Sequence, residues 1–399
     1  MLEGRSPPRF VTLVLLTAFS TLSLNMFLPS LVKIADDLET DYATASIAIG
    51  GFLAITAVVQ LIVGPLSDRL GRRPVLMGCL FAFALASIGC SLATDVWVFL
   101  AFRMLQGGMI SGYTLSLAII RDTTPEQKAA GLIGYISMSV AIAPMLGPMV
   151  GGFLDTAFGW RSIFQFYTLC GFALLLLCWF DLGETKPAAS ASPEAAPERT
   201  RDLLLEPVFW AYSLCSTFAV GAFYIFITGV PLVAQLEFGI STAQLGFFIG
   251  TISAGFMLGS FLSGRYAPIY NPVTMMLAGR ILACFGLLAG IAVFLLGQLS
   301  PLLFFSCTVF VGLGNGITIP SSSASAMSVR PKLAGAAAGL SGAMIVAGGA
   351  MLTTATSASL PEMNTSLALL GMMLVATLAS LASVFVAVYL NRKSAHSNP

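Results

Sequence analysis

Few side chains in this chain could do chemistry, and fewer still lie inside its long apolar runs. Arg103 lies in such a run, three residues before Gln106 and six residues after Trp97. A charge inside a bilayer is costly unless it is paired or hydrated, so Arg103 should face a helix-bundle interior or water, or else extend to the membrane surface. The sole histidine, His396, lies in a polar tail, which excludes His-based triads and histidine metal sites.

Cysteine chemistry is not indicated either. All seven cysteines fall inside apolar runs and none forms a Cys-x-x-Cys pair. Small buried hydrophobic side chains are their simplest interpretation. The sequence predicts no metal site and no cofactor, and no nucleotide-binding loop occurs in it.

A short charged segment interrupts the apolar runs early in the chain. It reads GPLSDRLGRRP from Gly64 to Pro74, with one acid, Asp68, beside Arg69, Arg72 and Arg73. Glycines such as Gly71 allow a tight turn and close helix approach. Asp68 could pair with an arginine across a helix–helix seam and hold one conformation closed. The alternative is a basic loop with an incidental acid.

A proline- and glycine-rich stretch follows in the fifth apolar run, APMLGPMVGG from Ala143 to Gly152. Pro144 and Pro148 share one helix face, and so do Gly147 and Gly151, with Gly152 next to them. Each proline removes a backbone hydrogen bond and bends the helix, whereas the glycines permit close packing. A kinked packing helix without a transport role is the alternative.

The elements that position these residues must be membrane helices. The chain has 399 residues, 57% hydrophobic and only 9% charged, with net charge +1 and mean hydropathy +0.91. Soluble domains carry about 25% charged residues, and a membrane helix needs about 20 apolar residues. Twelve spans are predicted: 10–31, 43–66, 75–93, 97–119, 130–153, 162–181, 207–231, 243–265, 273–294, 301–322, 334–356 and 365–390. The near-zero net charge gives no reason to expect nucleic acid as a partner.

Lysine and arginine predict the topology. With the N-terminus inside, sixteen of the 19 basic residues fall on the cytoplasmic side, Arg280 counted among them, and only Lys33 and Arg161 fall outside. Both termini are therefore predicted to be cytoplasmic. Four predicted parts follow: a six-helix half 1–181, a Pro-, Ala- and Glu-rich linker 182–206, a second half 207–390 and a tail 391–399.

Several of these motifs resemble one known family. The Gly64–Pro74 segment resembles the signature loop of the major facilitator superfamily, R-x-x-Q-G from Arg103 resembles its fourth-helix motif, and G-P-x-x-G-G from Gly147 resembles the fifth-helix motif of its drug/proton antiporters. With Asn25–Pro29 and Gly159–Phe164, the chain looks like the Bcr/CflA-type drug-resistance transporters. The corresponding segment between spans eight and nine, Ser263-Gly264-Arg265, is a degenerate repeat of the signature loop and has no acid.

The resemblance implies a fold and roles for residues. The fold is an all-α membrane protein of the major facilitator type, with 12 helices in two six-helix halves. The loop residues Asp68, Arg69, Gly71, Arg72 and Arg73 gate alternating access, and Arg103 with Gln106 serves proton coupling. The fifth-helix motif favours export over import.

One departure concerns the coupling ion. The family usually has Asp in the first-helix motif where this chain has Asn25, and asparagine cannot titrate. If the chain couples protons, another group must carry them, and Asp155, at the outer end of span five, is the candidate. Candidate substrate-binding residues are Asn25, Met26, Phe27, Tyr113, Met138, Tyr224 and Asn315. For the apolar members, helix packing is the alternative.

The sequence thus predicts a monomeric transporter, not an enzyme, in a bacterial cytoplasmic membrane. Its partners would be the lipid bilayer, a small amphipathic substrate and, as coupling ion, the proton. Export of drugs or xenobiotics is the first hypothesis. A same-fold importer or an uncoupled facilitator of a metabolite remains open, as do a membrane-embedded enzyme and a scaffold or receptor without transport.

Overall fold

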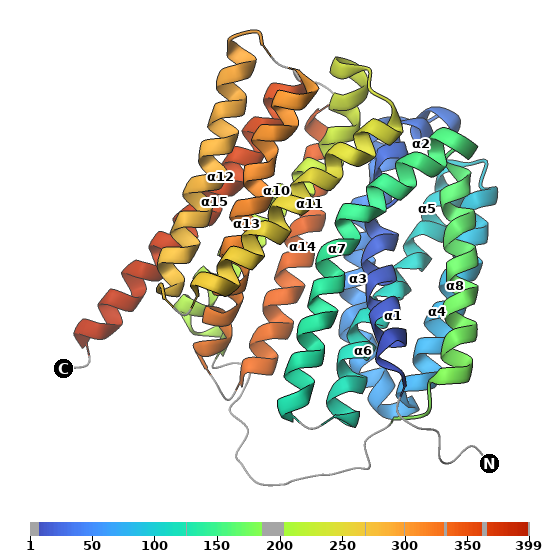
Figure 1. Ribbon diagram of the computed structural model, residues 1–399, viewed down its shortest axis with the longest axis horizontal. Helices are drawn as coiled ribbons and strands as arrows, with labels where there is room; N and C mark the ends of the chain where they lie inside the picture. Colours follow the sequence, from blue (N-terminus) through green and yellow to red (C-terminus); the bar gives the residue numbers. More distant parts are fainter. Residues whose placement is uncertain are drawn as a thin grey trace. The chain divides into compact units, whose positions relative to one another are not determined.

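The computed structural model describes residues 8–124, 126–185, 203–267, 269–298, 300–330, 333–360 and 365–397. This part of the chain contains helices and no strand, as the sequence predicts (Figure 1). It divides into two compact units, which are described separately below.

The first unit contains the N-terminal helices, together with Ile240–Gly250, which includes the first turns of α11. Its elements are α1 (Phe10–Asn25), the 3₁₀ turn η1 (Leu28–Ser30), α2 (Leu31–Asp37), α3 (Tyr42–Leu70), α4 (Arg72–Leu92), α5 (Val96–Leu105), the 3₁₀ turn η2 (Gln106–Met109), α6 (Ile110–Thr123), α7 (Glu126–Phe158) and α8 (Arg161–Asp181). Within it α4 packs on α8 and α1 packs on α7.

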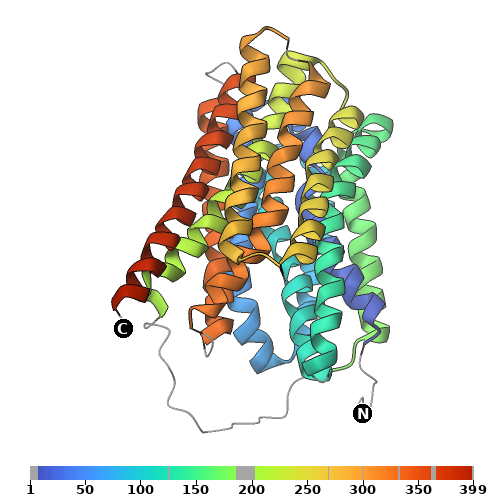
Figure 2. The same ribbon diagram turned by 60° about the vertical axis from the view of Figure 1, so that its left-hand side comes forward.

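The second unit contains the C-terminal helices. They are α10 (Pro207–Val233), the π-helical turn η3 (Ala234–Phe238), the remainder of α11 (Thr242–Tyr266), α12 (Pro272–Leu295), α13 (Pro301–Ser328), α14 (Ala334–Ser359) and α15 (Thr365–Ser397). Helices α12 and α13 run side by side, and α10 is flanked by α14 and α15 (Figures 1 and 2).

Every one of the twelve predicted spans overlaps a helical element. Ten helices in the described part are long and apolar enough to cross a membrane. The other two predicted spans correspond to the broken element α5–η2–α6 and to the 33-residue helix α7. Most of the predicted linker lies outside the described residues, and α15 continues to Ser397, into the segment predicted as a tail.

Two interruptions of the helices, at η1 and at η2, have direct causes in the sequence. Pro29 has no N–H group, so the helical hydrogen bond back to the Asn25 carbonyl cannot form, and α1 ends at Asn25 before η1 begins. At η2 the glycines Gly107 and Gly108 favour the tighter turn that separates α5 from α6. The first break lies beside Asn25 and the second beside Arg103 and Gln106, all candidate functional residues from the sequence.

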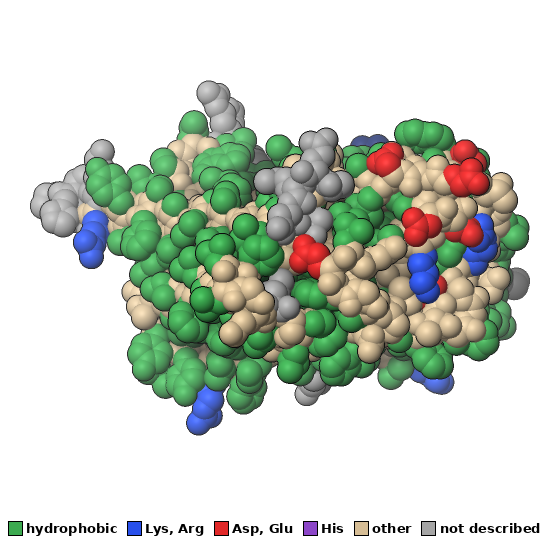
Figure 3. Space-filling view, turned by 90° about the horizontal axis from the view of Figure 1, so that it is seen from above, with side chains coloured by type: hydrophobic (Ala, Val, Ile, Leu, Met, Phe, Trp, Pro, Cys, Tyr) green, Lys and Arg blue, Asp and Glu red, His purple; other side chains and the backbone are tan. Residues whose placement is uncertain are grey.

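Charged side chains are concentrated at particular places on the surface. In the view of Figure 3 the acidic and basic side chains gather near α2 of the first unit, where Lys33, Asp36 and Asp37 are exposed. Leucine, phenylalanine and valine side chains are exposed along the helices. This is the surface expected of a protein whose sides face lipid.

Candidate functional site

The break in α1 places the first group of predicted residues. Asn25 is 2% exposed, and Met26 and Phe27 are fully buried. The Asn25 amide nitrogen donates to the Thr21 carbonyl oxygen at 2.9 Å, while its Oδ1 atom has no partner among the described groups. A buried amide oxygen without a donor is costly, so this position is poised to accept a hydrogen bond.

The glycines of α7 pack directly on this break. An ideal Cβ placed at Gly151 would lie 1.7 Å from the Met26 carbonyl oxygen, and one at Gly147 would lie 3.5 Å from the Met26 nitrogen. Pro144 and Pro148 lie inside the same helix. The Gly-Pro motif and the first-helix motif, more than 110 residues apart in the sequence, therefore form one seam.

Arg103 lies fully buried in the same unit, as its position in an apolar run predicts. Its Nη1 donates to Gln106 Oε1 at 2.7 Å, its Nη2 to the Ser23 carbonyl at 3.1 Å and its Nε to the Ala48 carbonyl at 3.3 Å. The guanidinium also lies over the rings of Phe27 and Phe52, at 4.4 and 4.0 Å from their centres.

Neutral groups therefore compensate the charge of Arg103. Carbonyl and amide oxygens accept its hydrogen bonds, and aromatic faces add cation–π attraction. Gln106 in turn donates to Ser87 Oγ at 2.7 Å, and Tyr167 donates to the Ser23 carbonyl at 3.1 Å. This network joins α1, α3, α4, α5 and α8. Phe27, predicted as a substrate contact, stacks on Arg103.

Asp155 is a buried acid near the end of α7. Its side chain is fully buried, and its Oδ2 lies 3.1 Å from Lys33 Nζ, whose side chain is half exposed. Four residues further along α2, Asp37 pairs with Arg161 at the start of α8, 2.5 Å apart. The Lys33–Asp155 pair is a contact that sequence reasoning missed, because the partners are 122 residues apart and meet only through the break in α1.

The signature loop forms a turn held by polar contacts. Gly71 has φ of 105°, a conformation that suits glycine. Arg72 donates to Asp122 Oδ2 at 3.1 Å and to Ser67 Oγ at 2.5 Å, and its backbone N–H donates to Glu184 Oε1 at 2.9 Å. Asp122 and Glu184 were not predicted as partners.

The other members of the loop differ in their surroundings. Arg73 donates to the Trp179 carbonyl at 2.9 Å and lies over its ring, and Arg69 is exposed. The Asp68 side chain lies outside the described part of the structure. A gating role for Asp68 therefore stays a prediction from sequence.

The second unit contains a buried arginine that the topology argument misplaced. Arg280 was counted with the cytoplasmic side, yet it is fully buried within α12, eight residues after the helix begins. Its Nη2 donates to Asn315 Oδ1 at 2.7 Å and its Nε to Thr318 Oγ1 at 3.0 Å. A basic residue this far inside an apolar run is the signal that could have identified it.

This contact also defines the surroundings of Asn315. Its amide nitrogen donates to the Ala219 carbonyl at 2.9 Å, so both ends of the side-chain amide have protein partners and connect α10, α12 and α13. Tyr224 is 9% exposed in α10, beside Gly349. Tyr113 is half-buried in α6, and the side chain of Met138 lies outside the described part.

Comparisons with known proteins agree on one family. Residues 13–354 match the model of the Major Facilitator Superfamily. The MFS-type transporter YdgK of Bacillus subtilis is 29% identical over 82% of this chain and 83% of its own length. Multidrug resistance protein MdtL of Escherichia fergusonii is 31% identical over 65% of this chain and 66% of its own length, and its Escherichia coli K12 counterpart is 30% identical over the same shares.

Solved structures show the same fold. A bacterial homolog of the human lysosomal transporter Spinster, in an inward-facing and unoccupied conformation, superposes with a TM-score of 0.72. The match covers 95% of this chain and 94% of the other at 17% identity. An occupied inward-facing form of such a homolog also gives 0.72, over 97% and 96% of the two chains, at 18% identity.

Proposed function

The chain belongs to the Major Facilitator Superfamily, and we propose that it exports small amphipathic compounds, such as drugs and other xenobiotics, by proton antiport with alternating access. Two relatives at about 30% identity bear the name multidrug resistance protein, which supports efflux. We place it as a monomer in a bacterial cytoplasmic membrane with both termini inside, in accord with the distribution of its basic residues.

The observation that carries this proposal is the seam between α1 and α7. Gly147 and Gly151 lie against the backbone at Met26, where α1 is broken, and no side chain separates the two helices there. A bend at Pro144 or Pro148 is therefore transmitted to the position of Asn25. This seam is where a substrate that occupies the Asn25 site would meet the moving helix.

Asp155 is the proposed proton carrier, since Asn25 cannot titrate. It lies one helical turn beyond Gly151 on α7, and the ion pair with Lys33 connects it to α2, the segment that follows the break in α1. Proton binding would neutralise the carboxylate and release Lys33. Protonation and movement at the break would then be coupled through the same two helices.

The buried charges of the two units favour neutral or zwitterionic substrates. Arg103 and Arg280 are buried cations, and Asp155 is already paired. These two buried cations would repel a permanent cation, and cation–π contacts recover only about 0.5–2 kcal/mol. Neutral or zwitterionic compounds are therefore the expected substrates, with permanent cations disfavoured.

The second candidate function is import, or uncoupled passage, of a small metabolite. The observation that favours it is Asn25 itself, because a polar contact that does not titrate is sufficient for a facilitator. Transport direction in oriented vesicles separates the two functions. Accumulation in inverted vesicles supports export, whereas accumulation only in right-side-out vesicles supports import.

A susceptibility panel tests the proposed export. The gene is expressed in a host that lacks its major pumps, and growth is measured against neutral phenicol-like compounds and quaternary ammonium dyes. We expect at least a fourfold rise in the inhibitory concentration of the neutral compounds and no change for the dyes. Resistance to the dyes alone would contradict the charge argument, and no resistance to any compound would favour the second function.

A further inference from the structure

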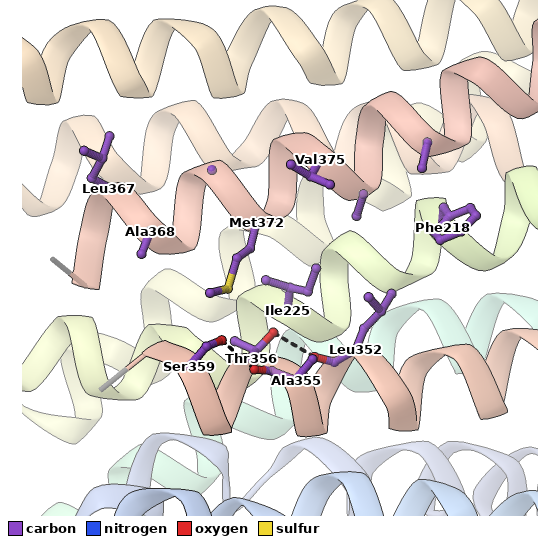
Figure 4. Close-up of a pocket in the computed structure, with 13 residues that line it drawn as sticks. Phe218, Ile225, Leu352, Ala355, Thr356, Ser359, Leu367, Ala368, Met372 and Val375 are labelled. Atoms are coloured by element: carbon purple, nitrogen blue, oxygen red, sulfur yellow. Dashed lines mark hydrogen bonds between the residues drawn. The ribbon is translucent and has the colours of Figure 1, made fainter. Parts of the chain in front are cut away.

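A groove of about 610 Å³ lies between α14 and α15 in the second unit, and both helices pack on α10. Figure 4 shows its lining, with Leu352 from α14, Met372 from α15 and Ile225 from α10. The hydroxyl groups of Thr356 and Ser359 in this lining donate to carbonyls of α14. The described lining therefore suits aliphatic groups in general and does not select one ligand.

Specific polar contacts occur instead at Glu184, in the segment that follows α8. The two residues before it, Leu182 and Gly183, are buried, and the Leu182 N–H donates to the Cys178 carbonyl at 2.9 Å. The chain is thereby held against the first unit as far as Glu184. Although the residue is exposed as a whole, its carboxylate reaches the turn between α3 and α4. The segment thus connects the end of α8 with the signature loop.

The Glu184 carboxylate occupies the space that a side chain at Gly71 would need. Its Oε1 accepts from the Arg72 backbone N–H at 2.9 Å. An ideal Cβ placed at Gly71 would overlap Oε2 of Glu184 and would lie 2.8 Å from its carboxyl carbon. Gly71 is therefore required for two reasons, because its φ of 105° suits glycine and because the carboxylate needs the room.

This carboxylate also lies at the N-terminus of α4. The first N–H groups of a helix have no partner within it, and the helix dipole places partial positive charge there. The N-cap residue of α4 is Gly71, which has no side chain that could accept from these groups. Glu184, 112 residues from Arg72 in the sequence, supplies the missing acceptor and a negative charge that the dipole attracts.

The same turn determines where the Arg72 side chain lies. Arg72 is the first residue of α4 and is only 7% exposed. Its guanidinium donates to Asp122 Oδ2 of α6 at 3.1 Å and to Ser67 Oγ of α3 at 2.5 Å. Because these contacts start from the first residue of the helix, a shift of the turn at Gly71 would change both of them.

We propose that Glu184 is a positioning residue of the gate: its carboxylate caps α4, fixes the turn at Gly71 and so holds Arg72 on Asp122. The gating role rests on the proposed alternating access, whereas the cap itself does not. Glu184 also lies in the predicted linker 182–206. The cap therefore ties the beginning of that linker to the signature loop.

Hydrogen–deuterium exchange of the purified full chain tests the cap. Wild type, Glu184→Ala and Glu184→Gln are compared, with Asp36→Ala, an exposed acid on α2, as the control. We expect the Arg72 amide to exchange at least tenfold faster in Glu184→Ala, to change less in Glu184→Gln, whose amide oxygen can still accept, and to be unchanged in Asp36→Ala. The Val273 amide at the capped start of α12 should be unchanged throughout, which reports an intact fold. Equal exchange at Arg72 in wild type and Glu184→Ala would overturn the cap.

Transport per inserted protein tests the positioning role. Glu184→Ala should lower the maximal rate at least fivefold with KM within twofold, because the loop is not among the proposed substrate contacts. Gly71→Ala should lower the rate less in the Glu184→Ala background than alone, because the carboxylate that the methyl group would meet is gone. An unchanged maximal rate despite faster exchange at Arg72, or additive effects of the two changes, would overturn the positioning role. Absence of transport by wild type would overturn the proposed function and the gating role with it, while the exchange result still decides the cap.

Discussion

In the described part of the structure, each of the two units buries one arginine that has no acid partner, and the two arginines differ in how many of their donors are satisfied. All three guanidinium nitrogens of Arg103 donate to oxygen atoms, and two aromatic rings cover it. Arg280 uses only Nε and Nη2, and its Nη1 has no partner in the described structure. A membrane protein can thus stabilise a buried cation with amides, carbonyls and rings, but the two units do so to different extents.

One helix seam in each unit, α1–α7 in the first and α10–α14 in the second, gives a second comparison. In the first unit Gly151 lies against backbone, the Met26 carbonyl. In the second unit the glycines of the α10–α14 seam lie against side chains: Gly221 against Leu352, Gly348 against Thr217 and Gly349 against Tyr224. Side chains can rotate away and backbone cannot, so the α1–α7 seam should tolerate less change than the α10–α14 seam. The less tolerant of these two seams is the one that carries the proposed mechanism.

The largest difference is expected between Gly151→Ala and Gly221→Ala. The first adds a methyl group 1.7 Å from a backbone oxygen, whereas the second meets the Leu352 methyl, which can move. Gly151→Ala should abolish transport and Gly221→Ala should retain at least half of it, measured per inserted protein by efflux from cells. Equal activities would show that the α1–α7 seam is not special.

The signature loop is compared next with its degenerate repeat, Ser263-Gly264-Arg265. Asp68→Asn should nearly abolish transport while membrane insertion is preserved, because an amide keeps the volume but removes one partner of the ion pair that the sequence predicts. Arg265→Gln, in the repeat that lacks an acid, should leave transport within about twofold of wild type. An inserted Asp68→Asn protein that transports at the wild-type rate would remove the gating assignment.

The two arginines can be compared through stability. Arg103→Met leaves Gln106 Oε1 without its donor, at about 1–3 kcal/mol, and removes the cation–π contacts with Phe27 and Phe52, at about 0.5–2 kcal/mol, so the free energy of unfolding should fall by more than about 2 kcal/mol. Arg280→Met leaves two acceptors but also removes an unpartnered donor, so about 1–2 kcal/mol is expected. Thermal unfolding in detergent measures both, and a larger loss for Arg280→Met would reverse the comparison.

The smallest effect concerns two helix caps, one acidic and one neutral. Asp41 caps α3 by accepting from the Thr44 hydroxyl at 2.6 Å and its N–H at 2.8 Å, and these bonds, the hydroxyl's first, lower the pKa of the carboxyl below 3.8. Because the folded pKa is the lower one, the stabilisation is present above pH 3.8 and is lost as the pH falls through the folded value. Ser241 pairs reciprocally with Gln244 at the start of α11 and does not titrate.

Asp41→Ala should therefore cost about 1 kcal/mol at pH 7, and this difference from wild type should shrink at pH 3.5. Ser241→Ala should cost a similar amount at both pH values. Unfolding curves at the two pH values measure both variants. A pH-independent loss for Asp41→Ala would show that the carboxylate does not act as the cap.

The helices could be predicted from sequence because each is a continuous apolar run. Arg103 could be identified as a candidate residue because a charge is conspicuous within such a run. The contacts that complete the sites could not be predicted. Lys33 and Asp155 meet only because Pro29 breaks α1, and the Arg280–Asn315 bond depends on how α12 packs on α13. Arg280 was assigned to the cytoplasmic side because a topology count considers charge and not depth. The docking of Glu184 on the backbone N–H of Arg72 leaves no local pattern in the sequence.

Substrate-induced proton release from proteoliposomes tests the central claim most directly, that this chain is a proton antiporter in which Asp155 carries the proton. Wild type, Asp155→Asn and Asn25→Asp are compared, with Asp36→Asn, an exposed acid on α2, as the control. We expect a signal in wild type and Asp36→Asn, its loss in Asp155→Asn, and a stronger pH dependence of transport in Asn25→Asp. No signal in wild type together with one in Asn25→Asp, or an undiminished signal in Asp155→Asn, would contradict it.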